Sequence, residues 1–305
     1  MHQSVLLSEI VESLRPSRDD GTLVDATIGL GGHAEALLER YPKTRLLGID
    51  RDPQALAASA SRLERFGNRV ALAQGRHETL IDILKKQNIE SVSGLLADLG
   101  VSSMQLDDAS RGFSFRYDAP LDMRMGPESR TAADLVNTLG EHEIATILRD
   151  YGEEPMARRI AKAIVTARAE GTIETTAKLA EIVRSVKWSK PGQIDPATLT
   201  FQALRIAANE ELIGLDKFID DAVEVIEPHA RIAIISFHSL EDRIVKRALR
   251  RLEGECTCPP NLPVCGCGAK EVVEILTGRP VTASEEEVQR NPRSRSAKLR
   301  VAEKK

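Results

Sequence analysis

The stretch from residue 22 to residue 100 alternates short apolar runs with segments of helical spacing, and this alternation strongly constrains the fold. Each apolar run has the length of one buried strand, and each intervening segment can return the chain as a helix. Strands joined in this way lie parallel, with helices on both faces of the sheet. The expected strands are Thr22–Thr27, Arg45–Asp50, Arg69–Ala73 and Gly94–Asp98, and the expected helices are His33–Arg40, Pro53–Arg65 with Asp52 as its cap, and His77–Gln87.

The alternation breaks between residues 105 and 215, where helical patterns follow one another without a convincing strand. Helices are expected at Leu139–Leu148, Glu154–Arg168, Thr176–Val186 and Thr198–Ile219. Strands then return, with a helix near Asp216–Ile226, a buried strand at Ala230–Phe237, and an antiparallel edge made of Glu271–Thr277 and Ser296–Ala302. The sequence therefore predicts an α/β domain of residues 1–104 and 216–305, into which an all-helical domain of residues 105–215 is inserted.

The composition is that of a globular protein with a full core, since 42% of the 305 residues are hydrophobic and 29% are charged. No apolar run approaches the roughly 18 residues of a membrane span. The N-terminus lacks the basic start and apolar core of a secretory signal, so a cytoplasmic protein without a membrane partner is expected. The net charge is −4, yet residues 231–305 carry fifteen Lys and Arg against ten Asp and Glu. A local basic face and a mixed, solvated surface both stay open.

A glycine-rich turn, residues 25–33, leaves the first expected strand and enters a helix. Parallel sheets bind ligands at this edge, and glycines let the backbone approach a ligand closely. Asp50 ends the next strand, nineteen residues after Gly31, where an acid commonly holds a ribose diol. The glycines follow a G-x-G-G pattern rather than G-x-G-x-x-G, which favours S-adenosylmethionine over a dinucleotide. A purely structural tight turn is the alternative.

Asp98 ends the fourth expected strand and is followed by small residues, so its carboxylate should face the same crevice as Asp50. Small side chains in the loop leave room for a substrate group. The alternative is an ordinary strand-end acid in solvent or a helix cap.

Long blocks along nearly the whole chain resemble one family, the bacterial 16S rRNA cytosine-N4 methyltransferases (RsmH, formerly MraW). Besides the glycine turn, the blocks are residues 2–7, 48–53, 98–103, 105–107, 111–115, 120–125, 151–154, 200–206, 236–243 and 291–296. The resemblance implies a Rossmann-like class I methyltransferase sheet with an inserted helical domain for RNA recognition. It also implies methylation of a cytidine N4 in 16S rRNA during maturation of the decoding centre. The substrate partner would be 16S rRNA within the small ribosomal subunit. The protein itself is expected to be a monomer or a homodimer.

The same resemblance implies which residues contact the methyl donor: Gly31, Gly32, His33, Asp50, His77, Asp98 and Gln105. Two positions depart from the family pattern. His77 stands where the family usually has Phe, which stacks near the adenine, and Met104 replaces a customary Pro before Gln105.

A cytosine amine is a poor nucleophile because its lone pair is delocalised into the ring, so the enzyme must orient the amine and accept its hydrogen bonds. The chain lacks the Asp/Asn-Pro-Pro-aromatic motif that many amino-methyltransferases use for this task. The hypothesis is that Asp98, or the loop of Ser102 and Ser103, supplies the acceptor, with His238 as a second candidate. The alternatives are that Asp98 serves the donor alone and that His238 is a structural histidine.

Arginines interleave with aromatic residues in two stretches, a mixture that suits phosphate pairing and base stacking on an unstacked RNA target. The RNA-binding candidates are Arg111, Phe113, Phe115, Arg116, Arg124, Arg293 and Arg295. The alternative is that Phe113 and Phe115 pack the insertion.

All four cysteines fall in one stretch, as Cys256, Cys258, Cys265 and Cys267. The C-x-C spacing is tighter than the usual zinc knuckle, so a non-catalytic zinc site and reduced thiols in a loop both stay open. A DNA amino-methyltransferase and a non-catalytic ribosome-assembly factor are the competing functions.

Overall fold

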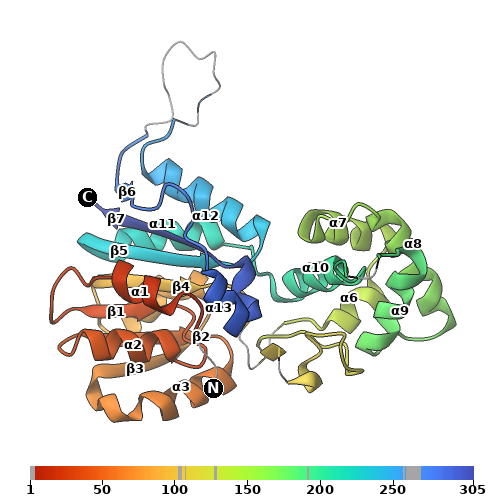
Figure 1. The fold of residues 1–305 in the computed structure, drawn as a ribbon, viewed down its shortest axis with the longest axis horizontal. Coiled ribbons are helices and arrows are strands. Elements are labelled where there is room, and N and C mark those ends of the chain that lie inside the picture. The colour runs from red at the N-terminus through yellow and green to blue at the C-terminus, as the bar shows by residue number, and fades with distance from the viewer. Residues whose placement is uncertain are drawn as a thin grey trace. The chain divides into compact units, whose positions relative to one another are not determined.

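The computed structural model describes residues 4–101, 105–106, 108–126, 129–190, 192–256, 258 and 269–305. It divides into two compact units (Figure 1). The sheet unit comprises residues 1–100 and 213–305, and the helical unit comprises residues 101–212. The boundaries expected from the sequence lie a few residues further along the chain. None of the described helices is long and apolar enough to cross a membrane.

The sheet unit holds seven strands in the order β3-β2-β1-β4-β5-β7-β6. The strands are β1 (Thr22–Asp25), β2 (Arg45–Asp50), β3 (Val70–Gln74), β4 (Val92–Asp98), β5 (Ile226–Ser236), β6 (Val273–Ile275) and β7 (Lys298–Lys304). The first five pair in parallel, and β7 runs antiparallel to both β5 and β6. The predicted α/β fold with an antiparallel edge is therefore confirmed.

Helices cover both faces of this sheet, as the alternation of strand and helix predicts (Figure 1). They are α1 (Leu7–Ser13), α2 (Gly32–Arg40), α3 (Pro53–Leu63), α4 (Leu80–Lys86), α11 (Leu215–Val225), α12 (Ser239–Leu252) and α13 (Glu285–Arg290), with 3₁₀ turns η1 (Glu64–Arg69), η2 (His77–Thr79) and η4 (Pro292–Ser296). In β4, Leu95 joins the apolar core beneath α4, α11 and α12, whereas Leu96 joins the core beneath α1 and α2. Successive side chains thus bury against opposite layers, which is why the parallel strands are apolar throughout.

The helical unit surrounds an apolar core of its own. Its described elements are η3 (Ala109–Arg111), α6 (Ala132–Thr138), α7 (Glu141–Gly152), α8 (Ala157–Glu170), α9 (Thr176–Val186) and α10 (Thr198–Asn209). Gly152 ends α7 against α10, where a Cβ atom would lie 2.7 Å from the Leu199 carbonyl oxygen. A side chain at this position would therefore force the two helices apart.

The prediction of one continuous helix over Thr198–Ile219 is wrong. The chain leaves the helix at Glu210, which adopts a left-handed conformation with φ 52°, and α11 begins only after Gly214 with φ 72°. The apolar spacing continues across the break because both helices bury one face, but each buries it in a different unit.

Candidate functional site

Three acids lie where parallel strands of the sheet unit end. Asp25, Asp50 and Asp98 are the last residues of β1, β2 and β4, and β1 pairs with both of the other strands. The strand order reverses between β1 and β4, because β2 and β3 extend one way and β5 the other. Such a switch point is where open α/β sheets bind their ligands.

The glycine turn connects β1 to α2 and needs its glycines for two physical reasons. Gly29 and Gly31 have φ angles of 51° and 74°, which side chains disfavour. At Gly32 a Cβ atom would lie 2.1 Å from the Ser4 hydroxyl oxygen. Gly31, the N-cap of α2, has no side chain to cap the helix, so the first turn of this helix can receive an anionic ligand group.

Asp50 fastens this turn to the end of β2. Its Oδ2 accepts a hydrogen bond of 2.9 Å from the backbone N–H of Gly29, and its Oδ1 accepts one of 2.9 Å from the N–H of Asp52. Burial nevertheless raises the pKa of Asp50 above its ordinary value. A carboxylate offers about four acceptor positions, so the group retains capacity for ligand hydroxyls.

Asp98 carries an oxygen without a partner. Its backbone N–H donates to the Thr27 hydroxyl at 2.6 Å, whereas its buried Oδ1 accepts no hydrogen bond from any described residue. Its Oδ2 lies 3.8 Å from Nδ1 of His33, whose Nε2 donates to the Val5 carbonyl at 2.8 Å. An unsatisfied buried acceptor costs about 1–3 kcal/mol, which a ligand donor would recover.

Asp25 and Asp98 also share an electrostatic environment that favours their protonated forms. Burial, and to a lesser extent the charge of Asp50, raises the pKa of Asp25 to about 7. Burial, followed by the charges of Asp25 and Glu241, raises the pKa of Asp98 well above its ordinary value. Carboxyl groups of this kind can exchange protons near neutral pH or stabilise a cation.

His77 lies in η2, which follows the carboxyl end of β3. Its imidazole contacts Phe218 edge-on, and its buried Nε2 has no hydrogen-bond partner among the described residues. Burial lowers the pKa of His77, so the ring is neutral near pH 7. The ring thus offers a ligand both an apolar face and a polar edge.

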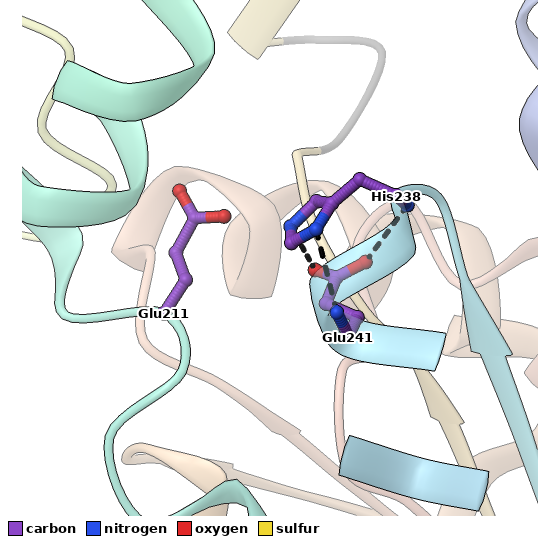
Figure 2. Close-up of side chains that lie close together, drawn as sticks. All are labelled: Glu211, His238 and Glu241. Carbon is purple, nitrogen blue, oxygen red and sulfur yellow. Dashed lines mark hydrogen bonds and ion pairs between the residues drawn. The ribbon is translucent and has the colours of Figure 1, made fainter. Parts of the chain in front are cut away.

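His238 caps the start of α12, directly after β5. Figure 2 shows its imidazole facing Glu241: Nδ1 accepts from the Glu241 N–H at 3.4 Å, and Nε2 lies 3.1 Å from Glu241 Oε1. Glu241 Oε2 in turn accepts the backbone N–H groups of Phe237 and His238 at 2.9 and 3.4 Å. The third side chain of Figure 2, Glu211, belongs to the helical unit and accepts two hydrogen bonds from the Arg205 guanidinium, at 2.9 and 2.8 Å.

The remaining site predictions fall elsewhere. Gln105 is buried and belongs to the helical unit. Ser102, Ser103, Cys265 and Cys267 lie outside the described residues, whereas Cys256 is exposed and Cys258 half-buried. Asp25 and Glu241 receive no role in the sequence analysis, because their burial and their charged neighbours arise only in the folded chain.

The aromatic residues expected to contact RNA pack inside the helical unit. Phe113 is buried in its core, and Phe115 contacts Phe201 edge-on with ring centroids 4.8 Å apart. This geometry favours the packing alternative. The Arg124 guanidinium donates two hydrogen bonds to Asp122, at 2.7 and 2.8 Å.

The Arg111 guanidinium donates to the Arg124 carbonyl at 2.9 Å and is half-buried. Arg116, Arg293 and Arg295 are exposed, and the last two lie in η4 of the sheet unit. These three arginines are therefore the candidates whose side chains remain accessible to a phosphate backbone.

Comparison with known proteins gives one consistent family. The model of the MraW methylase family matches residues 1–305. The ribosomal RNA small subunit methyltransferase H of Pelobacter propionicus is 50% identical over 310 residues, covering 99% of this chain and 98% of that protein. The protein of the same name from Geobacter sulfurreducens is 50% identical over 309 residues with the same coverage. Among solved structures, an rRNA methylase from Streptococcus thermophilus aligns with all of this chain and 98% of its own, at 13% identity and a TM-score of 0.42, too low to bear on the site.

Proposed function

Because the chain belongs to the MraW methylase family, we propose that it transfers a methyl group from S-adenosylmethionine to the exocyclic N4 of a cytidine in 16S rRNA. Relatives that match it over nearly their full length are named ribosomal RNA small subunit methyltransferases. At the level of single residues, the proposal rests on Oδ1 of Asp98, which is buried at the switch point of the sheet and has no hydrogen-bond partner among the described residues.

The sheet unit offers groups that suit the donor. Gly31, Gly32 and His33 begin α2, where backbone N–H groups can meet the donor's carboxylate, and Asp50 has acceptor capacity for ribose hydroxyls. The polar edge of His77 is available to a heterocycle such as adenine. The unpartnered oxygen of Asp98 and the raised pKa values of Asp25 and Asp98 fit a pocket that receives a cation. When bound, the donor supplies a sulfonium-activated methyl group. Gln105 remains a predicted donor contact from the helical unit.

Asp98 is the proposed acceptor for the amine. In the transfer, the N4 lone pair forms the new bond to the methyl carbon, the sulfur keeps the electron pair of the broken bond, and N4 loses one proton. An ionised Asp98 can accept a hydrogen bond from the amine and then that proton, because burial raises its pKa well above the ordinary value and so makes the carboxylate a stronger base. A hydrogen bond that strengthens as the amine becomes cationic lowers the barrier rather than merely tightening binding.

His238 is better suited to a supporting role. Its Nδ1 accepts the Glu241 N–H and its Nε2 lies 3.1 Å from Glu241 Oε1, so Glu241 holds the ring in place, although Nε2 makes no hydrogen bond with any described residue. It caps α12 and orders the end of β5 beside the acids. The Ser102 and Ser103 loop remains an alternative acceptor.

The substrate is proposed to be 16S rRNA within the small ribosomal subunit, which would place the enzyme in the cytoplasm. Accessible Arg116, Arg293 and Arg295 would contact phosphates, with a steep fall of affinity as salt is added. Whether the active form is a monomer or a homodimer does not enter this proposal. A zinc ion at the four cysteines stays a prediction, to be tested by metal analysis of protein purified without chelators.

The deciding experiment supplies labelled S-adenosylmethionine to purified enzyme with undermethylated small subunits, deproteinised 16S rRNA or double-stranded DNA. Methylation of a cytidine N4 in the subunits, with none in DNA, is the expected result. Label in DNA would favour the DNA methyltransferase, and donor binding without transfer to any of the three would favour a non-catalytic assembly factor.

A further inference from the structure

The connection between α9 and α10 carries an exposed tryptophan that no site described so far uses. Trp188 is the chain's only tryptophan, and 75% of its surface is exposed. Ile194, in the same connection, is 74% exposed. A side chain as large as indole gains stability from burial, so its display on a surface is typical of a contact site.

Ion pairs at both ends hold this connection in place. Lys187, directly before Trp188, extends its Nζ to 2.6 Å from Oε2 of Glu154, whose side chain is fully buried. At the other end, the Arg184 guanidinium donates to Asp195 at 2.8 Å. Because Glu154 lies just before α8, the first of these pairs ties the residue before Trp188 to the start of that helix.

The neighbouring surface is basic. Residues 156–190 contain eight Lys and Arg against three Asp and Glu, whereas the rest of the helical unit contains six against fourteen. Arg158, Arg159 and Lys162 are exposed on α8, as is Lys190 after Trp188. None of these four pairs with an acid within the described part of the chain, so their charge is available to a partner.

We propose that these residues form a platform for single-stranded RNA, on which Trp188 stacks a base while the cations bind flanking phosphates. The Trp188 platform consists of Trp188, Lys190, Arg158, Arg159 and Lys162. An exposed aromatic ring among uncompensated cations matches the chemistry of a single strand, whose bases are open to stacking and whose phosphates are closely spaced. A purely apolar protein partner would leave the four cations unmatched.

The inference rests on the proposed function, since it names a contact surface for the same RNA substrate. It assigns base stacking to Trp188 instead of Phe113 and Phe115, which pack inside the helical unit, and adds cations to the arginines that the sequence suggests.

Trp188 itself reports on the proposal, as it accounts for all tryptophan fluorescence of the full chain. Titration with a single-stranded RNA of about 12 nucleotides is expected to quench this fluorescence, and the same sequence as a duplex is expected to quench it much less. The logarithm of affinity should fall with the logarithm of salt concentration by about 0.7 per phosphate contacted.

Variants then separate the contributions, with affinity measured by anisotropy of labelled RNA. Trp188→Ala is expected to weaken binding roughly tenfold, and Trp188→Phe, which keeps a stacking face, by less than about threefold. Lys190→Gln should reduce the salt slope, whereas Lys43→Gln, an equally conservative change on the sheet unit, should leave it unchanged. Donor binding by calorimetry should be the same in all four variants.

RNA binding without quenching, or equal affinity for Trp188→Ala, would overturn the platform. If only intact small subunits quench the fluorescence and deproteinised RNA does not, the surface contacts a ribosomal protein and the proposal is wrong. These outcomes leave the methyltransferase proposal intact as long as the unaltered enzyme methylates the subunits. Loss of that activity in the unaltered enzyme would instead overturn the proposed function.

Discussion

The imidazole of His77 lies edge-on against the ring of Phe218, with 5.0 Å between the ring centroids and 71° between the ring planes. This contact joins η2, at the end of β3, to α11, which begins where the chain returns from the helical unit. The ring edge therefore helps to shape the proposed donor pocket, while its Nε2 has no hydrogen-bond partner in the described part of the chain.

His77→Phe is expected to raise the free energy of unfolding of the donor-free protein by about 1 kcal/mol, because it replaces an unsatisfied buried nitrogen with carbon. Urea unfolding with the donor absent measures the change. His77→Gln, which keeps a polar group of different shape at this position, should not raise the free energy of unfolding. A less stable His77→Phe protein would mean that Nε2 has a partner in solution, such as a bound water.

Asp25→Asn is expected to stabilise the protein at pH 8 and to matter little at pH 3. The pKa of Asp25 is raised in the folded state to about 7, whereas an unfolded Asp titrates near its ordinary value. The folded state therefore binds more protons, and the stability this group provides below pH 4 is lost as pH rises to about 7. Asn removes that loss, on the order of 2–4 kcal/mol, while its carbonyl can still accept the Thr27 N–H. Chemical unfolding of both proteins at several pH values tests this, and parallel pH profiles would contradict it.

Donor affinity should depend on pH in a way that distinguishes the reactive donor from its product. A positive sulfonium favours the ionised forms of Asp25 and Asp98, so affinity for S-adenosylmethionine should rise between pH 6 and pH 8. S-adenosylhomocysteine is neutral at sulfur and should show a much flatter profile. Calorimetric titrations of both compounds give the comparison. Identical profiles would place the acids away from the sulfonium.

Asp98→Asn and His238→Asn together test which side chain accepts the proton of the substrate amine. Asn caps helices well, so it should replace His238 at the start of α12 with turnover within about tenfold. At position 98 the same change removes the proton acceptor and should lower turnover by about 10²–10⁴-fold. Single-turnover methylation at saturating donor measures both. If the His238 variant loses more activity, the histidine is the catalytic group and its contact with Glu241 must open during reaction.

Several elements could be predicted because residues close together in the sequence determine them. The bounds of β2 and α9 agree with the expected segments, and Asp52 caps α3 with Pro53 in its first turn. The acids Asp50 and Asp98 were foreseeable because each ends an apolar run, and the topology of parallel sheets brings such ends together.

Other features depend on contacts that a local pattern does not contain. The seven residues of α6 are too few to form a helix without packing, so this element follows from the core of the helical unit. The break at Glu210 places an ordinary helix former in a left-handed conformation. The high pKa of Asp25 comes from burial and from charges distant in sequence, and the exposure of Trp188 is likewise a property of the packed chain.

Phe115→Ala and Arg116→Gln test adjacent residues that the sequence grouped together. Removing the half-buried ring should lower the stability of the helical unit by about 2 kcal/mol, because Phe115 contacts Phe201. Removing the exposed charge should leave stability within about 0.5 kcal/mol and weaken RNA binding at low salt. Thermal unfolding and anisotropy separate the effects. A stable Phe115→Ala protein with poor RNA binding would restore the ring as an RNA contact.

The strand at the C-terminus, β7, lies between β5 and β6 rather than at the edge of the sheet. Its buried Leu299, Val301 and Ala302 complete both apolar layers beside β5. Until β7 has been synthesised and has docked, the preceding strands therefore present an unpaired edge at β5. Shortened chains that lack β7 should be recognised by chaperones and proteases.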